Sequence, residues 1–125
     1  MADRLKEIFR ARESFMNLIR KHHDEVYKES WPLDISKKSS QKVLRETALK
    51  GVEEMFEALG HLKNWKSHRV HEIPEVDKEE FLEEIIDAFN YFYSLMILSG
   101  FNEDDFYKAF VKKDQIIRDR LSNKY

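Results

Sequence analysis

Residues 77–102, DKEEFLEEIIDAFNYFYSLMILSGFN, decide the fold class of this chain. Asp77 followed by Glu80 has the spacing of a capping box, which opens a helix. The apolar residues that follow recur at helical spacing, and Gly100 is a favourable place for the helix to end. Asn102 is a good N-cap, so a further helix is expected directly after it. A connection this short favours antiparallel helical neighbours.

The rest of the chain has the same helical character. Apolar residues recur at helical spacing in two earlier segments, with Ser39 or Ser40 as the N-cap of the second. Pro32 interrupts the pattern between them. The 125 residues include only three glycines and two prolines, too few for the turns of an all-β domain. The sequence predicts a single all-α domain over residues 1–125, a four-helix bundle with helices at about 3–27, 39–64, 77–100 and 102–121.

Composition excludes several classes of function. The 22 Lys and Arg nearly balance the 24 Asp and Glu, so no bulk attraction to a nucleic acid polymer is expected. Cysteine is absent, which excludes thiolate metal sites and thiol nucleophiles and leaves Asp, Glu and His as metal ligands. Residues 1–7 carry charges where a signal peptide needs apolar residues, and no window approaches a membrane span. We therefore expect a cytoplasmic protein that does not bind membranes.

Two pairs of carboxylates carry the functional signal. Glu54 and Glu57 are spaced i, i+3 on one predicted helix, and Glu84 and Asp87 have the same spacing on the next. Like charges at this spacing destabilise a helix unless solvent or a cation compensates them. If the two faces pack together, four hard oxygen ligands converge, which suits Mg²⁺ or Mn²⁺ shared with substrate phosphates. The alternative is an ordinary solvated surface on a chain that is 37% charged.

Basic, aromatic and amide residues flank these pairs. Lys63 and Lys66 follow the second predicted helix and could contact triphosphate oxygens. Trp65, between them, either stacks on a base or packs at the edge of the core, and we favour packing. Asn90 lies one turn after Asp87 on the same face, where it could bond the sugar or a ligand carboxylate, or be a satisfied helix amide.

The order ExxE, a gap, then ExxD resembles the signature of the all-α nucleoside triphosphate pyrophosphohydrolases, which include MazG-like proteins and dimeric dUTPases. Residues 58–98 look most like the dimeric dUTPases, with a Trp-Lys-rich stretch after ExxE and LEEIIDAF at 82–89 before an aromatic helix. The resemblance implies a Mg²⁺ site, with Mn²⁺ as a possible substitute, and water oriented by one of the first pair, by preference Glu54. The implied metal ligands are Glu54, Glu57, Glu84 and Asp87.

The C-terminal residues extend the resemblance and also limit it. The dimeric dUTPases have a Lys, an Asn four residues on, an Arg seven on and a Tyr twelve on. Lys113, Arg120 and Tyr125 fit this spacing, but Ile117 stands at the Asn position. Arg12 stands where the family has a Gln near the base. The resemblance assigns both of these positions to base recognition, so the preferred base is left open.

The resemblance implies hydrolysis of a nucleoside triphosphate, by preference dUTP, to a monophosphate and pyrophosphate by a homodimer or tetramer. One alternative is a MazG-like or dCTPase-like enzyme for another nucleotide. The other is a non-enzymatic helical dimerisation module, which would keep its apolar stripes but tolerate loss of any one carboxylate. The residues expected to bind substrate are Lys63, Trp65, Lys66, Asn90, Lys113, Arg120 and Tyr125.

Overall fold

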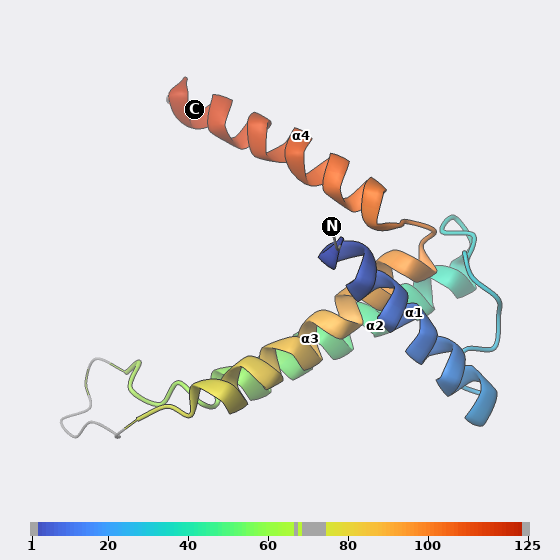
Figure 1. Cartoon of the computed structure of the whole chain (residues 1–125), viewed down its shortest axis with the longest axis horizontal. Coiled ribbons are helices and arrows are strands. Elements are labelled where there is room, and N and C mark those ends of the chain that lie inside the picture. Colours follow the sequence, from blue (N-terminus) through green and yellow to red (C-terminus); the bar gives the residue numbers. More distant parts are fainter. Residues whose placement is uncertain (1–2, 67, 69–74, 124–125) are drawn as a thin grey trace. The chain divides into compact units, whose positions relative to one another are not determined.

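The computed structural model describes residues 3–66, 68 and 75–123, and over these residues the chain is helical without strands. This confirms the all-α class. None of the helices in this part of the chain is long and apolar enough to cross a membrane. The four helices are α1 (Arg4–His22), α2 (Lys38–Leu59), α3 (Lys78–Leu98) and α4 (Glu103–Ser122) (Figure 1).

The chain divides into two compact units. The first joins Met1–Pro32 to Met96–Tyr125 and contains α1, the last residues of α3, and α4. The second is Leu33–Leu95, which contains α2 and most of α3. All four predicted metal ligands therefore belong to the second unit.

Helices α2 and α3 form an antiparallel pair in the second unit and lie side by side (Figure 1). Small residues fill the contact between them: Gly51 and Ala58 on α2 and Ala88 on α3 are buried, and both alanines are 0% exposed. A Cβ at Gly51 would lie only 2.9 Å from Cζ of Phe92 on α3. The absence of side-chain bulk at these positions lets the two helices approach closely.

The first unit is held by contacts between α1 and the start of α4. The rings of Phe9 and Phe106 lie with centroids 6.0 Å apart. Beside them, both terminal nitrogens of Arg10 donate to the carboxylate of Glu103, each at 3.2 Å. Glu103 is buried, so this bidentate pair satisfies a carboxylate that would otherwise be costly to bury.

Two of the predicted helices are shorter than expected. The first ends at His22 instead of near Tyr27, because residues 20–25 are all polar or charged and a turn in which the Val26 amide donates to the His23 carbonyl follows. The second ends at Leu59 instead of near Asn64. There Gly60 lowers helix propensity, and the chain continues as a turn in which the Leu62 amide donates to the Leu59 carbonyl.

The start of α2 also differs from the prediction, because the N-cap is Lys37 and its side chain makes no capping hydrogen bond. Ser40 instead lies inside the first turn and is only 2% exposed. Its hydroxyl oxygen is buried without a hydrogen-bond partner. A buried hydroxyl of this kind opposes folding, since it loses its bond to water and gains none in the protein.

Ser40→Ala is therefore expected to stabilise the protein. Alanine removes the unsatisfied hydroxyl and has the higher helix propensity, so the free energy of unfolding should rise by about 0.5–1 kcal/mol. Urea unfolding followed by circular dichroism measures this change. The exposed neighbour Ser39 provides the control, because Ser39→Ala should change the free energy by only a few tenths of a kcal/mol. A loss of stability in Ser40→Ala would show that the hydroxyl has a favourable partner.

The connection from α3 to α4 confirms the predicted capping residues. The Asp77 carboxylate accepts from the Glu80 amide at 3.0 Å, which caps the start of α3. At its end Gly100 has φ of +92°, and the Phe101 amide donates to the Met96 carbonyl at 2.9 Å, the pattern of a Schellman motif. Asn102 and Asp105 then form a reciprocal capping box that starts α4.

Gly100→Ala should destabilise the first unit, because an alanine in this left-handed conformation costs about 1–2 kcal/mol. Its Cβ would also lie 3.1 Å from Cβ of Pro32. The expected loss in the free energy of unfolding is measurable by urea titration. Unchanged stability would mean that the turn between α3 and α4 adopts another conformation in solution.

Candidate functional site

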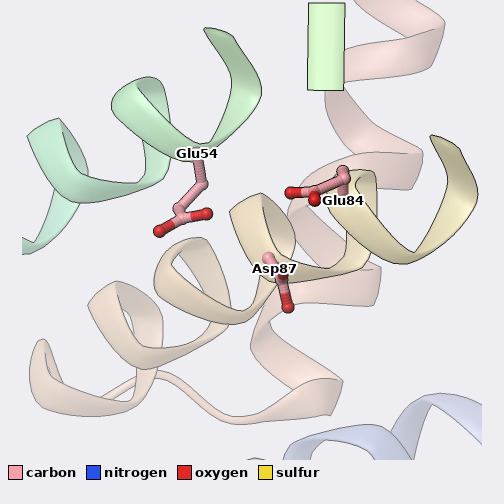
Figure 2. A group of neighbouring side chains, drawn as sticks. All are labelled: Glu54, Glu84 and Asp87. Atoms are coloured by element: carbon pink, nitrogen blue, oxygen red, sulfur yellow. The ribbon is translucent and has the colours of Figure 1, made fainter. Parts of the chain in front are cut away.

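Three carboxylates from two helices meet in the second unit. Glu54 projects from α2, and Glu84 and Asp87 project from α3, where their spacing of three residues places them on one side of the helix. One carboxylate oxygen from each lies within 4.8 Å of the others. Figure 2 shows the Glu84 carboxylate directed across the helix pair toward Glu54. The predicted convergence of the two acidic faces is therefore present in the structure.

Glu57 lies beside this group of three and interacts with Glu54. Partial burial raises the pKa of the Glu54 carboxyl above its ordinary value of 4.5, and it is the largest cause of the shift. The negative charge of Glu57 and a side-chain hydrogen bond with Glu57 raise the same pKa further. The charges of Asp87 and Glu84 add to the effect. Each of the other three predicted carboxylates is thus close enough to raise the pKa of Glu54.

The donor set fits a hard divalent cation. It consists only of carboxylate oxygens, which suit Mg²⁺ or Mn²⁺ and not a thiolate-binding metal. Two oxygens bound on opposite sides of Mg²⁺ at 2.1 Å span about 4.2 Å. The three carboxylate oxygens lie within 4.8 Å of one another, which is close to this span. Small side-chain rotations would bring the oxygens to a bonding distance.

The predicted substrate-binding residues of the second unit lie in the turn after α2 and on α3. Lys63 is exposed and Lys66 is half-buried. Our preference for packing of Trp65 was wrong: its side chain is 72% exposed, because α2 ends before it, and its ring lies 5.4 Å from the Lys66 ammonium. An exposed indole beside two lysines is free to stack on a planar ligand. Asn90 is partly buried on α3.

The remaining predicted residues belong to the first unit. Lys113 and Arg120 lie exposed on α4, and Tyr125 lies outside the described residues. Arg12 is partly buried on α1 with its guanidinium 5.2 Å from the centre of the Phe15 ring. Ile117 is exposed on α4. Of the predicted site residues, the structure thus brings together Glu54, Glu84 and Asp87, which all belong to the second unit.

Sequence reasoning missed the residues that allow this convergence. Helix propensity alone makes Gly51 a weak point of α2, yet it lies at the contact with Phe92. Ala58 and Ala88 are buried in the same helix pair. The available signal was the spacing of small residues around Glu54, three residues before it and four after it, which is typical of a face that packs closely.

Comparisons of the chain with protein-family models, with curated proteins and with solved structures give no match.

Proposed function

We propose that this chain is a Mg²⁺-dependent nucleoside triphosphate pyrophosphohydrolase that hydrolyses dUTP to dUMP and pyrophosphate. The observation that carries the proposal is the meeting of Glu54, Glu84 and Asp87 from two helices within 4.8 Å. Their order in the chain, together with Glu57, also matches the ExxE and ExxD pattern of the all-α pyrophosphohydrolases. The geometry thus brings together three of the four residues of the sequence pattern.

The four carboxylates would have different roles in the site. Glu84, Asp87 and Glu54 would hold the cation, and Mg²⁺ bound there would supply neutralisation of the charge that develops on the phosphate oxygens. Glu54 also orients the attacking water and accepts its proton. Glu57, one turn after Glu54 on α2, is close enough to act on it electrostatically and would add a fourth carboxylate beside the cation.

The basic residues next to the site would bind the rest of the substrate. Lys63 and Lys66 lie in the turn that follows α2, and cations in this position stabilise negative charge on a triphosphate. Trp65, exposed between them, offers a ring for the base. Asn90 would bond the sugar, and Lys113, Arg120 and Tyr125 are assigned to the phosphates and the base by the family spacing alone.

A homodimer forms part of the proposal. Helix α4 exposes large apolar side chains, including Phe110 and Leu121, the latter 82% exposed. Exposed apolar surface on this scale is typical of an interface with another chain. A second copy covering α4 would account for it, and sedimentation equilibrium gives the mass that tests this assignment. A monomer at micromolar concentration would contradict it.

The activity is tested by pyrophosphate release from a panel of deoxynucleoside and nucleoside triphosphates, with Mg²⁺ and again with EDTA. The proposal expects release from dUTP that requires the metal. Metal-dependent release from another nucleotide would support the carboxylate site and contradict the choice of dUTP. Arg12 and Ile117, which differ from the dUTPase pattern, concern only recognition of the base. Release from no nucleotide would contradict the enzymatic proposal and favour the helical dimerisation module.

A further inference from the structure

We infer that Gly51 is a positioning residue: its missing side chain sets the distance between α2 and α3 at which Glu54 reaches Glu84 and Asp87. The inference rests on the proposed function, because it assigns Gly51 a role in cation binding by that site. It goes further by identifying what makes the site possible in this chain. The site depends on a contact between one glycine and one aromatic ring on the facing helix.

The contact is tight. A Cβ added at Gly51 would lie 2.9, 3.0 and 3.2 Å from three atoms of the Phe92 ring, whereas ordinary contacts of a Cβ fall between 3.4 and 4 Å. Phe89 on the same helix lies edge-on to this ring, with centroids 6.5 Å apart. Space for even one methyl group therefore requires the helices to separate or the pair of rings to repack.

Glu54 lies between two small buried residues of α2, of which Gly51 contacts α3. Gly51 precedes it by three residues and the fully buried Ala58 follows it by four, so both lie on the turns next to it. On α3 the fully buried Ala88 directly follows Asp87. Any change in helix separation at this contact is transmitted to the distance between Glu54 and the two carboxylates of α3.

Cation binding requires the three carboxylates to stay close together. One oxygen from each lies within 4.8 Å of the others, and two oxygens on opposite sides of Mg²⁺ lie about 4.2 Å apart. Separation of the helices would move Glu54 away from the two carboxylates of α3. A glycine inside a helix is less favourable than alanine, and the close approach to Phe92 explains why glycine occupies this position nevertheless.

The test measures Mn²⁺ affinity by electron paramagnetic resonance in wild type, Gly51→Ala, Phe92→Leu and the double variant. Gly51→Ala should weaken Mn²⁺ binding at least about tenfold, the lower end of the effect of residues that support a metal site. Phe92→Leu removes ring atoms from the contact, so the double variant should recover affinity to within about threefold of Phe92→Leu alone. This recovery separates positioning from general loss of stability, which urea unfolding measures in parallel.

Gly60→Ala is the matched control. It makes the same substitution at the end of the same helix, where the new Cβ would meet only the Glu57 carbonyl oxygen of its own helix, at 3.1 Å. Its Mn²⁺ affinity should match that of wild type. Wild-type affinity in Gly51→Ala, or no recovery in the double variant, would overturn the positioning inference alone. Absence of Mn²⁺ binding by wild type would overturn both this inference and the proposed function.

Discussion

Asp87→Asn and Glu57→Gln are each expected to reduce kcat/KM for pyrophosphate release at least about 100-fold. Mutation of a residue that merely supports a metal ligand typically lowers metal affinity or activity about 10–100-fold. The loss of a ligand, or of Glu57 beside Glu54, should lower activity by more than that. Both substitutions keep the shape of the side chain and remove its charge. Because they also remove repulsion within the cluster, thermal stability without metal should be equal to or higher than that of wild type.

Glu83→Gln and Glu53→Gln are the matched controls for this prediction. Each lies next to a residue of the site on the same helix, is exposed, and is outside the group of converging carboxylates. Pyrophosphate release by these variants should remain within about twofold of wild type, since isolated surface charges contribute little. Full turnover in both Asp87→Asn and Glu57→Gln would show that the acidic cluster is a solvated surface and not the catalytic site.

The acidic pair of α3 could be predicted from the sequence because two local regularities were sufficient. A spacing of three residues places Glu84 and Asp87 on one side of a helix whatever surrounds it. The start and end of that helix were marked by Asp77 and Gly100, whose capping roles depend on neighbouring backbone groups alone. That Glu54 of α2 reaches the same region depends on how the two helices pack, which these local regularities do not specify.

Other features depend on contacts distant in the sequence and could not be predicted. The exposure of Trp65 follows from the end of α2 at Leu59, and the apolar pattern alone had extended that helix to about residue 64. The distance between α2 and α3 depends on the pairing of Gly51 with Phe92, which no spacing rule specifies. Helix propensity indicates only that glycine is unfavourable at position 51. The packing of the two helices shows that a larger residue there would meet the Phe92 ring.

The second large effect is expected from divalent cations, which should stabilise the protein at neutral pH and not at acidic pH. The pKa of Glu54 is raised in the folded state, so the stability contributed by this group is present below the unfolded value of 4.5 and is lost as the pH rises through the folded value. At neutral pH the cluster is therefore charged and repulsive. A cation that binds only the folded state at 100 times its Kd should add about 2.7 kcal/mol.

Acidification should abolish this stabilisation, because a protonated carboxyl is a poor metal ligand. The rise in Tm produced by 10 mM Mg²⁺ should therefore be largest above pH 7 and should disappear as the pH falls toward 4.5, beginning at a higher pH than an ordinary glutamate would require. Differential scanning calorimetry at several pH values measures this dependence.

In Glu54→Gln the Tm without metal should exceed that of wild type at pH 7, and the response to Mg²⁺ should be lost. Glu53→Gln should behave as wild type. A Mg²⁺ response that persists in Glu54→Gln, or that does not vary with pH, would place the cation elsewhere on the protein.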